Sequence, residues 1–268
     1  MGGQGEPERL AARIADDHAA GRQFAGYAPP GGGDLALAYA AQDAVVRQLQ
    51  AAGRGRPAGW KIGLTSPRMQ SFLGVTHPLA GVILDSRVMQ GPAEVSLAGY
   101  GRLGLECEIA LRIGSDLAPR RTPLGRAEAA ALVAGIAPAF ELVDDRAAVY
   151  EGLDAFSIVA DNGWSAGAVL GPELAVWPDL AACTGRFAAD GAVIEEGSGG
   201  DVLGHPLAAL AWLAAHLGTR GQTLPAGSLV MTGSMVRTHF AEPGHSYGFA
   251  LAAPDGAPMG EVALRVTA

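Results

Sequence analysis

Lysine is almost absent from this chain. It has eighteen arginines but a single lysine, Lys61, and Asn162 is its only asparagine. A chain that uses arginine for its surface charge has little need of one lysine as a solubilising group. An ammonium is a compact charge whose pKa shifts readily on burial, whereas a guanidinium stays protonated. The composition therefore favours a functional role for Lys61 over the alternative that it is an ordinary surface lysine left by chance.

Cysteine, net positive charge and long apolar runs are also lacking. Cys107 and Cys183 are the only cysteines and form no CxxC pair, which fits a reducing cytosol better than a disulfide framework. No signal-peptide pattern and no run of eighteen apolar residues is present, so we expect a cytoplasmic protein without a membrane partner. The net charge of -8 argues against a nucleic-acid partner.

Several catalytic motifs are missing as well. No GxGxxG motif opens a helix after a strand, and no Gly-Lys-Ser/Thr motif for nucleotide phosphates is present. The GxSxG spacing at residues 163–167 leads into a predicted strand and not into a helix, so it is not the strand-to-helix elbow of serine hydrolases. Its six histidines are too scattered for an HExxH zinc site. The 268 residues, of which 49% are hydrophobic and 17% charged, nevertheless describe a globular protein long enough to be an enzyme.

The most informative segment is Glu106-Cys107-Glu108, which lies inside an apolar run. If this run is a strand, both glutamates point to one face and Cys107 to the other. A third acid, Glu141, lies in another apolar run that also has the pattern of a strand. Three converging carboxylates would form a site for Mg²⁺ or Mn²⁺. The alternative is that these glutamates are strand-edge charges that face solvent.

Helices are predicted in the first fifth of the chain and strands dominate the rest. Residues 8 to 20 and 34 to 52 have helical signals, and a short strand with Lys61 covers 58 to 64. One later helix starts at Pro206, with a leucine stripe typical of core packing. Further strands are predicted at 105 to 113, 136 to 143, 166 to 170, 186 to 189, 229 to 232, 247 to 252 and 262 to 266. We therefore expect a helical N-terminal cap over residues 1–57 and a metal-binding, β-rich catalytic domain over residues 58–268.

Several longer motifs occur in a fixed order from residue 59 onward. They are Gly59-Trp60-Lys61-Ile62-Gly63-Leu64-Thr65, Glu106-Cys107-Glu108-Ile109-Ala110, Pro138-Ala139-Phe140-Glu141-Leu142-Val143-Asp144 with Arg146, Val159-Ala160-Asp161-Asn162, Val202-Leu203-Gly204-His205-Pro206 and Leu229-Val230-Met231-Thr232-Gly233-Ser234. Together they resemble the fumarylacetoacetate hydrolase superfamily, within it the branch of 2-hydroxypenta-2,4-dienoate hydratases and 4-oxalocrotonate decarboxylases.

The resemblance implies a fold, a site and a reaction. The fold would be α+β, a mixed β-roll with a helical N-terminal cap, in a cytoplasmic homo-oligomer. Glu106, Glu108 and Glu141 would bind Mg²⁺ or Mn²⁺, and Lys61 would be catalytic. Burial near a cation should lower the pKa of Lys61. Residues that would contact a small 2-oxo acid substrate are Gly63, Leu64, Arg146, Asn162, Trp164, Thr232 and Ser234.

The reaction implied first is hydration of a 2-hydroxy-2,4-dienoate to a 4-hydroxy-2-oxo acid in aromatic catabolism. The alternatives are decarboxylation of a 2-oxo-enedioate, hydrolysis of a C–C bond in an acylpyruvate-like substrate, and an inactive binder of 2-oxo acids. The chain departs from the hydratase branch at two places: Leu79 and Ala80 stand where an acidic residue is usual, and Gly163-Trp164 replaces a small residue. Both changes make the expected pocket less polar or differently shaped.

Overall fold

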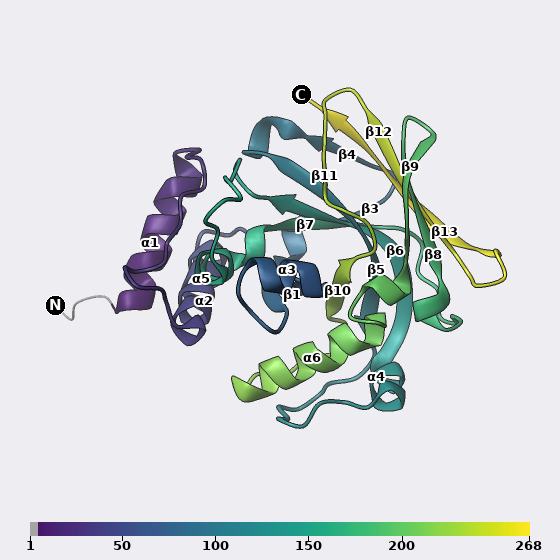
Figure 1. Cartoon of the computed structure of the whole chain (residues 1–268), viewed down its shortest axis with the longest axis horizontal. Helices are drawn as coiled ribbons and strands as arrows, with labels where there is room; N and C mark the ends of the chain where they lie inside the picture. Colours follow the sequence, from purple (N-terminus) through teal and green to yellow (C-terminus); the bar gives the residue numbers. More distant parts are fainter. Residues whose placement is uncertain (1–4) are drawn as a thin grey trace.

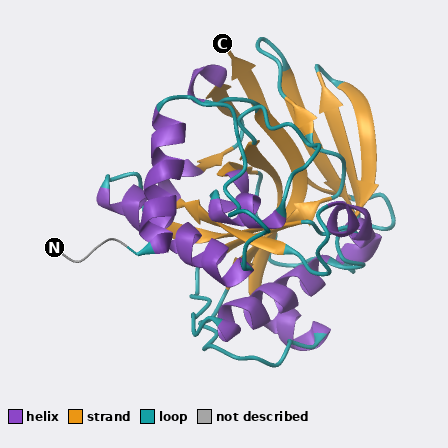
Figure 2. Cartoon of the chain, turned by 60° about the vertical axis from the view of Figure 1, so that its left-hand side comes forward, coloured by secondary structure: helices purple, strands orange, loops and turns teal. Residues whose placement is uncertain are grey.

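Two β-sheets form the body of the protein, and helices cover one side of it. The computed structural model describes residues 5–268. The helices α1 and α2 lie at the opposite side of the molecule from the C-terminal strands β12 and β13 (Figure 1). In the rotated view, helices lie at the left and along the bottom of the molecule, and the long strands rise at the upper right (Figure 2).

The helices are α1 (Glu6–Ala19), α2 (Leu35–Ala51), α3 (Pro67–Phe72), α4 (Arg126–Leu132), α5 (Ala155–Ala160) and α6 (Pro206–Thr219). The strands are β1 (Pro57–Gly63), β2 (Leu79–Leu84), β3 (Val88–Gln90), β4 (Ala93–Ser96), β5 (Leu103–Ile113), β6 (Val133–Asp144), β7 (Ser165–Leu170), β8 (Thr184–Ala189), β9 (Ala192–Ser198), β10 (Leu229–Ser234), β11 (His239–Phe240), β12 (Ser246–Ala252) and β13 (Pro258–Thr267).

The larger sheet is mixed and strongly curled. Its order is β2-β1-β10-β5-β6-β7-β3, and β11 pairs with β5. The pairs β1–β10 and β3–β7 are parallel, whereas the other pairs of this sheet are antiparallel. The sheet curls far enough for β2 to contact β7, two strands that are not hydrogen-bonded neighbours. The central strands β10, β5 and β6 therefore line a concave face.

The smaller sheet packs against the other face of the larger one. Its order is β4-β13-β12-β8-β9, and the β8–β9 hairpin turns at Asp190-Gly191, a pair typical of hairpin turns. Phe140 of β6 contacts Phe187 of β8 and Phe249 of β12, with ring centroids 5.9 and 6.4 Å apart. All three rings are essentially inaccessible to solvent. The core between the sheets is thus built from the apolar residues of alternating strand positions.

The helix α6 belongs to the core. Its leucines Leu207, Leu210, Leu213 and Leu217 are buried, as the stripe in the sequence predicts. The segment Gly199–Thr219 is long and apolar enough to cross a membrane by length and composition, but 56% of its most apolar window is buried inside the protein. Packing against the sheet accounts for that apolar character.

The N-terminal helices form where the sequence predicts them. The Asp34 side chain caps α2 by accepting a hydrogen bond from the amide of Ala36. Ala11 and Ile14 of α1 are fully buried and belong to the same hydrophobic core as the sheet residues. The α+β fold with a helical N-terminal cap is confirmed, while the division into domains at residue 57 stays a prediction.

Candidate metal and substrate site

Three glutamates converge on the concave face of the larger sheet. Along β5, Cys107 and Ile109 face the core between the sheets, and Glu106 and Glu108 face the other way. The β5–β6 register places Glu141 directly opposite Glu106. One oxygen from each carboxylate lies within 4.8 Å of the other two, so the predicted convergence is confirmed. Glu108 and Glu141 are 0% exposed, which rules out strand-edge charges facing solvent.

Hydrogen bonds from the protein reach only some of the oxygens of these carboxylates. The amide of Gly233 donates to Glu108 Oε2 over 2.8 Å, and the Thr238 hydroxyl donates to Glu106 Oε1 over 2.5 Å. Within residues 5–268, Glu108 Oε1 and Glu141 Oε2 are buried without a hydrogen-bond donor, and Glu141 Oε1 is paired with the ammonium of Lys61. Unpaired buried oxygens and close like charges both cost free energy. A divalent cation with oxygen ligands removes both costs, so the residues fit Mg²⁺ or Mn²⁺.

Burial and repulsion between the carboxylates raise the pKa values of the two buried glutamates. Burial is the largest cause for Glu108, followed by the charges of Glu141 and Glu106, and the pKa of Glu108 lies well above its ordinary value. Burial also raises the pKa of Glu141, to about 7, although Lys61 opposes the shift. Without a cation, the site therefore resists carrying three negative charges.

Lys61 joins the carboxylates from β1. Its Nζ atom lies 2.8 Å from Glu141 Oε1, and the side chain is 7% exposed. Burial lowers the pKa of Lys61, but the charges of Glu141, Glu106 and Glu108 outweigh burial, and the pKa is raised. The expectation of a lowered pKa is therefore wrong for the protein without bound metal, because three carboxylates surround the ammonium.

A left-handed turn holds the stem of Lys61 in place. Asn162, Gly163 and Trp164 have φ angles of 51°, 61° and 57°. The Asn162 carbonyl approaches Gly81 so closely that a Cβ atom there would lie 2.4 Å from the oxygen, and it would also lie 3.1 Å from the Lys61 stem. Glycine is therefore required at position 81. Left-handed residues with side chains are costly, and this strain is stored directly beside the lysine.

A cavity of about 670 Å³ opens above Lys61 and Glu106. Four of the predicted substrate-binding residues line it: Gly63, Leu64, Trp164 and Ser234. Leu79 and Ala80 of β2, the two residues that depart from the hydratase pattern, line it as well. Substrate contact by these residues stays a prediction, but the structure brings them to one place.

The other three predicted residues are not brought to this cavity. Arg146 forms a buried ion pair with Asp161, Nη2 to Oδ2 over 2.5 Å. The side chain of Asn162 binds the backbone of Val82, and the Thr232 hydroxyl donates to a backbone carbonyl of β5 over 2.8 Å. Each of these polar groups is engaged within the protein. Their contribution to the site is therefore to hold its walls.

Two polar groups of the site escaped the sequence-based reasoning. Thr238 reaches Glu106 because β11 returns to pair with β5, His239 opposite Leu105. The Gly233 amide points at Glu108 because the pairing of β10 with β5 shifts between Met231 and Ser234. Such a bulge turns one amide out of the ladder. The glycine in the β10 motif is a weak signal for the bulge, and nothing in the sequence marks Thr238.

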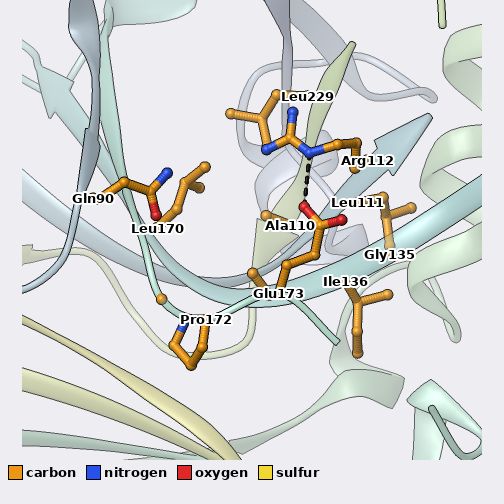
Figure 3. Close-up of a pocket in the computed structure, with 12 residues that line it drawn as sticks. Gln90, Ala110, Leu111, Arg112, Gly135, Ile136, Leu170, Pro172, Glu173 and Leu229 are labelled. Carbon is orange, nitrogen blue, oxygen red and sulfur yellow. Dashed lines mark hydrogen bonds and ion pairs between the residues drawn. The ribbon is translucent and has the colours of Figure 1, made fainter. Parts of the chain in front are cut away.

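A second, smaller cavity lies at the other end of the same strands. Its volume is about 90 Å³, and Arg112 and Glu173 pair within it over 2.7 Å (Figure 3). The charges of Arg112 and Glu173 neutralise each other, and the volume is too small for a substrate of several carbon atoms. This smaller cavity is therefore not a candidate for the site of chemistry.

Comparison with known proteins shows which family the chain belongs to. A family model described as fumarylacetoacetate (FAA) hydrolase C-terminal matches residues 69–263. The chain belongs to this family. The matched segment contains all three glutamates, and Lys61 lies eight residues before its first residue.

Curated relatives in the family include hydratases and decarboxylases. A 2-keto-4-pentenoate hydratase of Burkholderia vietnamiensis is 38% identical over 229 residues, which are 84% of this chain and 86% of that protein. A 4-oxalocrotonate decarboxylase of Pseudomonas putida is 32% identical over 214 residues, 78% of this chain and 79% of that protein. The relatives are thus lyases of two kinds.

Solved structures confirm the fold. The 4-oxalocrotonate decarboxylase from Pseudomonas putida G7, complexed with magnesium and adipate, has a TM-score of 0.86, 28% identity and 97% coverage of both chains. The same enzyme has been solved with calcium and acetate. A fumarylpyruvate hydrolase from Pseudomonas aeruginosa, in complex with Mn²⁺ and pyruvate, shares the fold with a TM-score of 0.58 at 18% identity.

Proposed function

We propose that this protein is a divalent-metal-dependent hydratase that adds water to a 2-hydroxy-2,4-dienoate and yields a 4-hydroxy-2-oxo acid. The observation that carries the proposal is the meeting of Glu106, Glu108, Glu141 and Lys61 beside one cavity. The 38% identity to a 2-keto-4-pentenoate hydratase selects the reaction among those that such a site can support.

The three glutamates would hold Mg²⁺ or Mn²⁺. Their carboxylate oxygens would be the ligand atoms, and Thr238 and Gly233 fix two of the carboxylates by donating hydrogen bonds to them. When bound there, the cation would supply Lewis acidity that stabilises negative charge developing on a 2-oxo acid. The protein contributes the orientation of the ligands and the exclusion of water from their buried side.

Lys61 would hold and move a proton at its Nζ atom. Its pKa is set by burial, which lowers it, against the three carboxylates, which raise it. Neutralising the carboxylates therefore moves the pKa of Lys61 downward, toward values at which the ammonium can give up a proton near neutral pH. An arginine at this position would keep the charge and lose the exchange.

Decarboxylation of a 2-oxo-enedioate is the second candidate. It is supported by the decarboxylase structure that covers 97% of this chain. Hydrolysis of a C–C bond ranks third, because such hydrolases of the superfamily use a His-Glu pair to activate water, and no histidine is among the described residues that line the cavity. An inactive binder of 2-oxo acids ranks last, because the carboxylates and the lysine are all in place.

The test is to supply the protein with Mg²⁺ and separate 2-hydroxydienoates and 2-oxo-enedioates. We expect loss of dienol absorbance without release of CO₂, and no reaction after chelation of the metal. CO₂ release from an enedioate at a higher rate would make the protein a decarboxylase. Absence of both signals, with binding retained, would leave an inactive binder.

The setting of this reaction is part of the same proposal. A cytoplasmic location, a homo-oligomer and a place in aromatic catabolism stay predictions. The described structure is a single chain, and its cavity is lined by residues of that chain. Size-exclusion chromatography with light scattering measures the oligomeric state directly.

A further inference from the structure

The cavity is larger and more apolar than a five-carbon acid requires. Its volume of about 670 Å³ lies within the range of roughly 300–1,000 Å³ that accommodates drug-sized ligands. Much of its wall is built from large apolar side chains, among them Leu64, Leu79, Leu153, Ile158, Trp164 and Phe240. Apolar surface of this kind gains free energy when a ligand removes it from water.

The charges near the glutamates are already balanced. Three glutamates carry three negative charges and Lys61 one positive charge, so a divalent cation brings the sum to zero. One substrate carboxylate then makes the site negative. A second carboxylate would add further negative charge. It would need a separate cationic side chain to offset the cost of its desolvation.

The rest of the lining offers little to a second carboxylate. Glu195, Glu196 and Asp201 are negative, and Arg237 is engaged by Glu195 over 3.0 Å. Within residues 5–268, Arg68 of α3 is the cation of this lining that has no carboxylate partner. Arg68 is exposed, and a single exposed arginine is a weak site for an additional anion.

We propose that the substrate is a monoanionic 2-hydroxydienoate whose chain continues as an apolar group of about four or more carbon atoms, an alkyl chain or an aromatic ring. The glutamates and Lys61 receive the acid end, and the apolar wall receives the other end. The inference rests on the proposed function for the acid end. It adds that a second carboxylate at the far end is disfavoured.

Binding of stable 2-oxo acids tests this without turnover. Isothermal titration of the Mg²⁺-loaded protein should show that Kd falls by about fourfold for each added methylene from 2-oxobutyrate through 2-oxohexanoate to 2-oxooctanoate. 2-Oxoadipate, which has the length of 2-oxohexanoate with a second carboxylate, should bind about tenfold more weakly. Equal Kd values along the series overturn the proposal. The proposal is also overturned if 2-oxoadipate binds as tightly as 2-oxohexanoate and loses that affinity in the Arg68→Met variant.

Two lysine variants on α3 locate the apolar end. Met69 lines the cavity, Ser71 does not, and no residue of this helix is buried, so both variants should fold. Met69→Lys should raise the Kd of 2-oxooctanoate by about fivefold and lower the Kd of 2-oxoadipate by about fivefold. Ser71→Lys adds the same charge and should change both Kd values by less than twofold. Identical behaviour of the two variants would show that the ligand's far end does not contact this wall.

The outcomes separate this inference from the proposed function. A graded chain-length series in a protein that turns over no dienoate would disprove the hydratase and keep the apolar end. Hydration of dienoates with no dependence on chain length, in binding or in KM, would keep the hydratase and disprove the apolar end.

Discussion

Asn162 holds strand β2 by both backbone polar atoms of one residue, Val82. Its Oδ1 atom accepts from the Val82 amide over 2.7 Å, and its Nδ2 atom donates to the Val82 carbonyl over 2.8 Å. The pair fixes the left-handed turn against Gly81 and thereby the stem of Lys61. The sole asparagine of the chain thus has a positioning role behind the cavity wall.

Asn162→Ala should lower the free energy of unfolding by about 3 kcal/mol, because it leaves two buried backbone groups unpaired. Urea unfolding with linear extrapolation measures this loss. Asn162→Gly is the matched variant: it loses the same hydrogen bonds but tolerates the φ of 51°. If the glycine variant is as stable as the unmodified protein, the two hydrogen bonds contribute nothing.

Glu108→Gln should abolish Mg²⁺ binding and metal-dependent turnover while the protein still folds. The amide keeps the volume and an acceptor for the Gly233 amide, and it removes one of three repelling charges. The readout is the rise of Tm on addition of Mg²⁺, which the unmodified protein should show and the variant should lack. A variant that is stabilised by Mg²⁺ as much as the unmodified protein would mean that Glu108 is not a ligand.

Lys61→Arg should reduce turnover by roughly 100-fold, the loss expected for a proton-transfer group. The backbone of Gly81 lies tightly against the lysine stem, so the larger guanidinium also has little room. Steady-state kinetics and Mg²⁺ affinity are measured together, and the affinity should change little. Near-normal turnover in this variant would reassign the proton transfer to another residue and leave Lys61 as a fixed charge.

Thr238→Val should weaken Mg²⁺ binding by about tenfold, as expected when a hydrogen bond to a ligand is lost. The hydroxyl donates to Glu106 Oε1 over 2.5 Å and holds the most exposed of the three carboxylates in place. Calorimetric titration with Mg²⁺ gives the affinity. Thr219→Val is the control, because the Thr219 hydroxyl donates to a backbone carbonyl of α6, and its variant should bind Mg²⁺ normally.

His216→Phe should make the protein less sensitive to acid. Burial lowers the pKa of His216 to about 4 from 6.5, so between these pH values the unfolded chain binds a proton that the folded chain does not. Stability is therefore lost as pH falls from 6.5 to 4, by at most about 1.4 kcal/mol per pH unit from this group. Phenylalanine keeps the ring contacts with Tyr39 and Trp212. Urea unfolding at pH 7.5 and 5 should show a smaller difference in the variant, and an unchanged difference would contradict the assignment.

The sequence by itself determined several of the elements and the shared orientation of two of the three glutamates. Strand alternation in β5 places Glu106 and Glu108 on one face whatever the rest of the chain does, because successive side chains point to opposite faces. That Lys61 is the only lysine of the chain can also be read from the sequence alone. The helix at 34 to 52 is also predictable from the sequence, because its Asp34 cap is a local hydrogen bond.

Tertiary structure decided what depends on residues far apart in the chain. Glu141 completes the cluster only through the β5–β6 register, and Thr238 joins it only because β11 returns to β5. Arg146 has its partner in Asp161, a contact that draws it away from the cavity. The direction of the pKa shift of Lys61 also had to come from the structure. Local sequence indicates burial, whereas the shift depends on how many carboxylates the fold gathers around one ammonium.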